Sequence, residues 1–270
     1  MTKIMKRYIF FTYAVFWCFL LLILLEMYTI KSGVLTTILQ IVSSWTPITV
    51  FTIMFHKLFP GQNFWGYLKR QFHERIHLPI LLSIIAIQLL ALLANAYIAA
   101  SLSGKPMLSL LLLSPGFLVV TFFTQLIYGP IGEELGWRAY ILTELQTKYS
   151  PLKSTVIVWL IWSFWHLPLW FLTTGFTGMK LLQYSIMFLL FNLGGSILIT
   201  AFYNLNHNLI IPILIHQLFN FLGCLIKKTD NIQILTTFAF IYLFIAIIVI
   251  AVNYKHCLRK RNLIPISTVR

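Results

Sequence analysis

The stretch YIFFTYAVFWCFLLLILLEMYTI, residues 8–30, decides the fold class of this chain. It is a continuous apolar run with one charged side chain, Glu26, near its end. A membrane-spanning helix needs about 20 mostly apolar residues, and this run is long enough. Basic residues precede it and no small-residue cleavage site follows it. It is therefore predicted to be a retained first span rather than a cleaved signal.

Comparable apolar runs recur along the chain, and the composition agrees with them. Of 270 residues, 59% are hydrophobic and 10% are charged, whereas soluble domains carry about 25% charged residues. We therefore expect an all-α, polytopic membrane helix bundle in which residues 1–270 form a single integral membrane domain. About eight transmembrane helices are expected, over residues 8–30, 34–56, 78–101, 107–128, 154–173, 181–204, 208–226 and 232–254.

Two segments are not predicted to span the membrane. Residues 57–77 mix aromatic and basic side chains, which is typical of an amphipathic helix in the membrane interface. Residues 131–148 carry two adjacent acids. Their pattern leaves open whether they form a separate helix or continue the preceding span.

The net charge of +14 comes from twenty Lys and Arg against six Asp and Glu. The basic residues fall in short clusters between apolar runs, which indicates contact with anionic lipid headgroups rather than with nucleic acid. Most of them lie in alternate connecting segments, so the positive-inside rule places both termini in the cytoplasm. The expected partner is therefore the lipid bilayer, with no nucleic acid. The three cysteines have no ligand spacing and predict neither a disulfide framework nor a metal site.

The segment GPIGEELGWRAY, residues 129–140, holds two of the six acids side by side. On a helix, Glu134 and Arg138 are four residues apart, a favourable spacing for an ion pair. Glu133 is turned about 100° away and has no such partner, because residue 137 is Trp. We expect Glu134 and Arg138 to form a structural ion pair and Glu133 to point into a polar cluster.

Three further polar side chains lie inside expected spans, where ionisable and amide groups are costly and mark functional sites. They are His166, His216 and Asn220, and the last two share a helix face at a spacing of four residues. The expected topology brings them to the depth of Glu133 beneath the cytoplasmic surface. One alternative is a polar network that only holds helices together. Another is a proton relay in a transporter, but no polar residues continue toward the other side.

These motifs together resemble a known family. The patterns Glu133-Glu134-xxx-Arg138, Trp162-xxx-His166 and His216-xxx-Asn220, within about residues 120–225, resemble the CAAX protease and bacteriocin-processing family of intramembrane endopeptidases. The resemblance implies a bundle of about eight membrane helices with its catalytic core in this region. It also implies hydrolysis of a peptide bond in a membrane-associated peptide or protein tail. The family usually has Phe where this chain has Trp162, and we expect similar packing.

The resemblance also implies roles for individual residues. Glu133 would activate a water molecule, His166 would assist it, and His216 with Asn220 would stabilise the oxyanion. Glu134 and Arg138 would hold the helix in place, and Trp162 would support the site.

Two questions stay open at this point. Glu133, His166 and His216 could hold Zn²⁺ with an open position, as in a metalloprotease. The chain has no HExxH motif, however, and the amide of Asn220 is a better oxyanion donor than a zinc ligand, which favours a glutamate-activated water. The alternative to an enzyme is a non-enzymatic membrane protein for bacteriocin immunity or peptide signalling.

Overall fold

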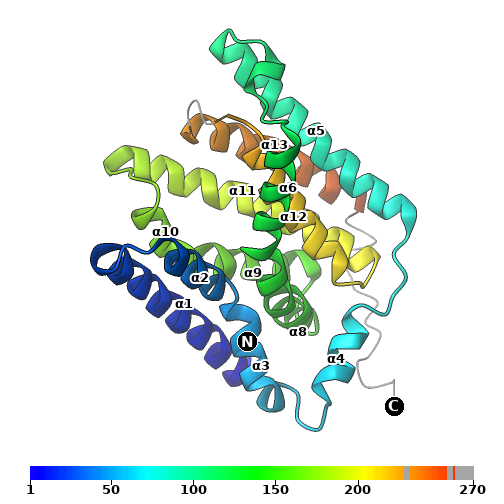
Figure 1. The fold of residues 1–270 in the computed structure, drawn as a ribbon. Coiled ribbons are helices and arrows are strands. Elements are labelled where there is room, and N and C mark those ends of the chain that lie inside the picture. The colour runs from blue at the N-terminus through cyan, green and yellow to red at the C-terminus, as the bar shows by residue number, and fades with distance from the viewer. Residues whose placement is uncertain (228–230, 254–257, 259–270) are drawn as a thin grey trace.

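The structure is a computed structural model that describes residues 1–227, 231–253 and 258, and it is helical as predicted (Figure 1). Within those residues the only β pairing is an isolated antiparallel bridge between Leu111 and Ile226. The elements are α1 (Lys3–Thr29), α2 (Gly33–Ser44), α3 (Thr46–Leu58), α4 (Phe64–Gln71), α5 (Leu78–Ser103), η1 (Met107–Leu110), α6 (Pro115–Ile127), α7 (Pro130–Glu134), η2 (Leu135–Leu142), α8 (Thr143–Gln146), α9 (Pro151–Trp165), α10 (Leu167–Leu172), α11 (Gly178–Leu205), α12 (Ile210–Cys224) and α13 (Asn231–Asn253).

The structure does not confirm the number of membrane spans that the sequence predicted. Among the described residues, five helices are long and apolar enough to cross a membrane, or six if a bent pair is one span. The five are Lys3–Thr29, Leu78–Ser103, Pro115–Gln146, Gly178–Leu205 and Ile232–Val252. The bent pair is α2 and α3, at 48°. The expectation of about eight spans is therefore not confirmed.

Two of the expected spans form shorter helices for identifiable reasons. The predicted span 154–173 divides into α9 and α10, because Pro168 in the first turn of α10 cannot continue the hydrogen-bond ladder. The predicted span 208–226 becomes α12, which has 15 residues. At 1.5 Å per residue its length is about 22 Å, less than the roughly 30 Å of a bilayer core.

The two segments predicted not to span also differ in part from expectation. Of residues 57–77, only Phe64–Gln71 form a helix of their own, whereas Leu58 still belongs to α3. Residues 131–148 continue the preceding helix, because α7, η2 and α8 follow α6 after a short break at Gly129. The acidic pair therefore lies within a segment that is long and apolar enough to span.

Helix α12 lies at the centre of the bundle and packs against α5, α6, α7 and α11 (Figure 1). Two buried glutamines fix its backbone to its neighbours. Gln88 on α5 donates a hydrogen bond of 3.3 Å to the carbonyl of Ile215. Gln217 donates one of 2.7 Å to the carbonyl of Phe122 on α6. These contacts hold the residue before His216 and the residue after it.

The helix that carries the acids packs on α1 and α3 through a face without side chains. A Cβ atom added to Gly132 would lie 2.7 Å from Trp45, and one added to Gly136 would lie 2.2 Å from the hydroxyl of Tyr8. Small residues four apart allow helices to approach this closely in membranes. The acidic side chains are thereby left to face α9 and α12. The following η2 is a π-helical segment, a form that is frequent at functional sites.

Candidate active site

The predicted ion pair is present, and it has a further partner. Arg138 Nη1 lies 2.9 Å from Glu134 Oε1, as the spacing of four residues predicted. The same oxygen lies 2.7 Å from Nδ1 of His216 on α12. All three side chains are almost fully buried. Glu134 therefore joins two helices, and it also orients the imidazole of His216 with Nδ1 toward the carboxylate.

Glu133 is held by two indole groups that the sequence interpretation did not assign to it. Its Oε2 accepts hydrogen bonds from Nε1 of Trp162 at 2.5 Å and from Nε1 of Trp137 at 3.3 Å. Trp137 provides no ion pair, as expected, but its indole N–H donates a hydrogen bond that the sequence interpretation did not foresee. Both donors bind Oε2, so they fix the carboxylate and leave Oε1 available for other contacts.

Oε1 of Glu133 meets α12 next to the helix break at Gly129. A Cβ atom added to Gly129 would lie 3.2 Å from Oε1 of Glu133 and 3.4 Å from Nδ2 of Asn220. It would lie 3.6 Å from Cε1 of His216. A carboxylate oxygen, an amide nitrogen and an imidazole ring thus surround one small space, which exists because residue 129 has no side chain. Three of the four predicted site residues are brought together here.

His166, the fourth, follows the last residue of α9. Its Nδ1 lies 2.9 Å from the carbonyl oxygen of Trp162. A carbonyl only accepts, so Nδ1 carries the proton and Nε2 is left as an acceptor. His166 and Glu133 line the same cavity of about 580 Å³. The remaining lining is mostly apolar and comes largely from α1 and α10, and it includes Phe16, Leu20 and Leu169.

Trp162 contacts three of the residues that form the site. Beyond its hydrogen bond to Glu133, its ring lies 4.3 Å from the guanidinium carbon of Arg138, which is a cation–π distance. Its ring also packs edge-on against His216, with centroids 5.0 Å apart. The supporting role expected of this residue is therefore combined with a direct bond to Glu133.

Asn220 lines a second, smaller cavity of about 230 Å³. It is lined by residues of α11, α12 and α13, and by Gln125 of α6. The site therefore contributes to two cavities, with Glu133 and His166 lining one and Asn220 lining the other.

The residues named as possible zinc ligands do not fit that role in this arrangement. Within residues 1–227, 231–253 and 258, no group of three or more His, Cys, Asp and Glu side chains is placed to hold a metal ion. Glu133, His166 and His216 are thus neighbours without forming a ligand set. We derive no step through a metal.

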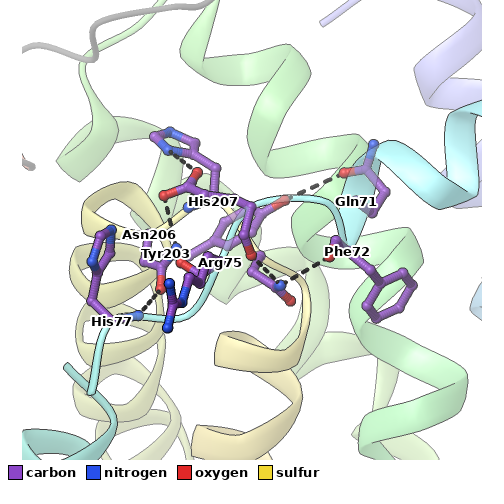
Figure 2. Close-up of polar contacts among 9 residues, drawn as sticks. Gln71, Phe72, Arg75, His77, Tyr203, Asn206 and His207 are labelled. Carbon is purple, nitrogen blue, oxygen red and sulfur yellow. Dashed lines mark hydrogen bonds and ion pairs between the residues drawn. The ribbon is translucent and has the colours of Figure 1, made fainter. Parts of the chain in front are cut away.

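A polar cluster at the start of α12 holds this helix in register (Figure 2). Glu74, in the segment between α4 and α5, accepts from Nδ2 of Asn206 at 2.7 Å and from the backbone N–H of His207 at 2.9 Å. Asn208 donates back to the carbonyl of Glu74 at 2.7 Å. Asn206 also accepts from the backbone N–H of His77 at 3.2 Å. These contacts tie the α4–α5 segment to the loop before the helix of His216 and Asn220.

Sequence reasoning missed Trp137, Gly129 and the Glu74 cluster as parts of the site. Trp137 carried a usable signal, because it lies four residues after Glu133. Gly129 and Glu74 carried none, since their roles depend on which helices pack together.

Comparisons with known proteins identify the family of this chain. The family described as type II CAAX prenyl endopeptidase, Rce1-like, matches residues 114–222. CAAX prenyl protease 2 of Methanococcus maripaludis is 30% identical over 203 residues, which covers 71% of this chain and 73% of the relative. The helical membrane fold and these matches define an intramembrane protease. The chain belongs to the Rce1-like CAAX prenyl endopeptidase family.

Proposed function

We propose that this endopeptidase hydrolyses a peptide bond in a membrane-associated peptide or protein tail at the space beside Gly129. The observation that carries this proposal is the approach of Glu133 Oε1, Asn220 Nδ2 and the His216 ring to that one point. General-base catalysis needs a base within hydrogen-bond reach of water, and an oxyanion needs donors close by. Both kinds of group meet here.

Each side chain has a role in the proposed reaction. Oε1 of Glu133 takes a proton from water, and the hydroxide attacks the carbonyl carbon of the substrate. Nδ2 of Asn220 donates to the developing oxyanion. The ring of His216, oriented through Nδ1 by the Glu134 carboxylate, faces the same point and assists in stabilising the oxyanion. The proton held by Glu133 passes through Nε2 of His166 to the peptide nitrogen as the C–N bond breaks, so that an amine and a new carboxyl group are released. Glu134, Arg138 and Trp162 hold these groups in position.

The two cavities suggest how a substrate lies. The larger cavity, mostly apolar, fits a hydrophobic group near the cleaved bond, and the smaller one receives the chain beyond it. The name of the Methanococcus maripaludis relative points to a prenylated tail as one substrate to compare. From the distribution of basic residues, we place both termini in the cytoplasm and the site toward that side.

The test is cleavage of a labelled, lipid-anchored peptide by the full chain in liposomes, with prenylated and unprenylated tails compared. Glu133→Gln should abolish cleavage. Asn220→Ala should lower the rate by about 10²–10³, as removal of an oxyanion donor does elsewhere. Glu144→Gln is the matched control, because this carboxylate lies on the same segment and lines neither cavity.

Two further arms complete the design. Unchanged cleavage in the presence of a strong chelator would agree with a glutamate-activated water, and loss that is restored by Zn²⁺ would contradict it. Family membership supports hydrolysis over a purely binding role such as bacteriocin immunity. Full cleavage by Glu133→Gln would overturn the proposed mechanism.

A further inference from the structure

A second cavity of chemical interest lies far from the acids, between the start of α1 and the end of α3. It measures about 680 Å³, and four cationic side chains line it, namely Lys3, Lys6, Arg7 and Lys57. Among the described residues, no acidic side chain lines this cavity, and none of the ion pairs found involves these cations. Four cations around one cavity favour a negatively charged occupant.

The cavity has a charged level and an apolar level, and a free anion would need only the charged one. Lys6 is followed four residues later by Phe10, so the two side chains share one face of α1, with the cation nearer the helix start. On α3, Met54 precedes Lys57 by three residues, so they share a face in the same manner. Phe10 and Met54 both line the cavity. Cations therefore lie at its outer level and apolar side chains lie one helical turn deeper.

This layering matches the two parts of a phospholipid. Helix α1 is a candidate span that starts at Lys3, and the bent pair α2 and α3 returns to the same edge and ends at Leu58. The cations are thus at the edge of the apolar layer, where juxtamembrane Lys and Arg attract anionic lipids. We propose that the cavity binds an anionic phospholipid, with its phosphate against Lys6, Arg7 and Lys57 and an acyl chain along Phe10 and Met54.

Such a lipid would join two helices that also touch the candidate active site. Tyr8, which follows Arg7 in the chain, is buried and donates a hydrogen bond of 2.9 Å to the carbonyl of Pro47 at the start of α3. The ring of Tyr8 packs edge-on against Tyr140 of η2, with centroids 5.1 Å apart. Further along α1, Phe16 and Leu20 line the cavity of Glu133. A lipid bound across α1 and α3 therefore stabilises one wall of that cavity.

The experiment measures lipid retention by the full-length protein, independent of cleavage. Protein purified from nanodiscs of phosphatidylglycerol and phosphatidylcholine is examined by native mass spectrometry, with the apparent affinity obtained by titration. The wild type should retain one phosphatidylglycerol in preference to phosphatidylcholine. The variant Lys6→Gln with Lys57→Gln should bind it at least about tenfold more weakly, since each cation near the surface contributes about 1 kcal/mol.

Two variants serve as controls. Lys148→Gln with Lys153→Gln removes equal charge outside the cavity and should keep the wild-type affinity. Lys6→Arg with Lys57→Arg keeps the charge and should also retain the lipid. Equal retention of both lipids by the wild type, unchanged retention by the Gln variant, or an equal loss in the Lys148 and Lys153 control would overturn the proposal. None of these outcomes depends on the proposed hydrolysis.

Discussion

The imidazole Nδ1 of His216 lies 2.7 Å from the Glu134 oxygen that also receives Arg138, at 2.9 Å. One carboxylate therefore neutralises a buried guanidinium and orients a proposed oxyanion donor. The two adjacent glutamates make different contacts, but they are not fully separated, because Glu134 also bonds to the imidazole that faces the space beside Gly129.

Replacing Glu134 should mainly lower the stability of the protein, whereas replacing Glu133 should mainly abolish cleavage. Glu134→Gln leaves the buried charge of Arg138 without its partner, and breaking such a pair costs about 3–5 kcal/mol of unfolding free energy. Thermal unfolding in detergent should show a large decrease for this variant. Glu133→Gln keeps an oxygen that accepts from the indoles, so it should unfold near the wild-type temperature while cleavage is lost. A similar unfolding temperature for both variants would contradict this division.

The parts of the site that the sequence predicts are those set by local geometry. The pairing of Glu134 with Arg138 follows from a spacing of four residues, and so does the shared face of His216 and Asn220. The same spacing relates Glu133 to Trp137, but a Trp is more often a packing residue, so its bond to the carboxylate was not anticipated. The all-helical membrane class followed from composition alone.

The remaining features depend on tertiary packing. The contact of Trp162 with Glu133 requires α9 to lie against α7, and the space at Gly129 requires α12 to approach the helix break. The predicted count of about eight spans is not confirmed for a different reason. Hydropathy identifies apolar runs, but it does not show that Pro168 divides one run in two, or that α12 is short.

The hydrogen bond from Trp162 to Glu133 should matter for cleavage more than for folding. Trp162→Phe keeps an aromatic ring over Arg138 and removes one of the two donors to Oε2. Hydrogen bonds to charged groups contribute about 1.5–3 kcal/mol, and Trp137 still donates, so we expect a loss of about tenfold in kcat.

Trp159→Phe is the matched control for that variant. Trp159 lies one turn earlier on α9 and donates a hydrogen bond of 2.8 Å to the carbonyl of Leu189. The Trp159→Phe variant loses an indole donor of the same kind, but that donor bonds to Leu189 and not to Glu133. Its unfolding temperature should fall at least as far as that of Trp162→Phe, with kcat unchanged. Equal effects of both substitutions on kcat would show that the loss reflects general weakening of α9.

A methyl group at residue 129 should block the reaction space. In Gly129→Ala the added carbon would lie 3.2 Å from Oε1 of Glu133, closer than most carbon contacts allow, and would occupy the place where water must bind. Small misplacements of catalytic groups cost up to about 10² in rate, so cleavage should fall at least tenfold. Gly116→Ala is the control, since no atom lies within 4 Å of its added carbon. Normal cleavage by folded Gly129→Ala protein would argue against this position for the reaction.

The polar cluster before α12 can be tested by moving its negative charge from Glu74 to residue 206 (Figure 2). Asn206→Asp places a second carboxylate beside Oε1 of Glu74, where Nδ2 now donates at 2.7 Å. Glu74 is partly exposed, so solvent weakens this repulsion, and the lost hydrogen bond should lower the free energy of unfolding by about 1 kcal/mol. Because the loop leads directly into α12, which carries His216 and Asn220, the rate of cleavage should fall together with the stability.

Adding Glu74→Gln to that variant should restore most of both properties. The Gln amide then donates to the introduced carboxylate, while its oxygen still accepts from the backbone N–H of His207, which bonds to Glu74 at 2.9 Å. Thermal unfolding and cleavage of the two single variants and the double variant form a double-mutant cycle, in which contacting residues show a coupling of about 0.5–3 kcal/mol. If the double variant is no more stable than Asn206→Asp alone, the contact does not hold the loop. The register of His216 and Asn220 must then be set by Gln88 and Gln217, whose bonds flank His216 within the bundle.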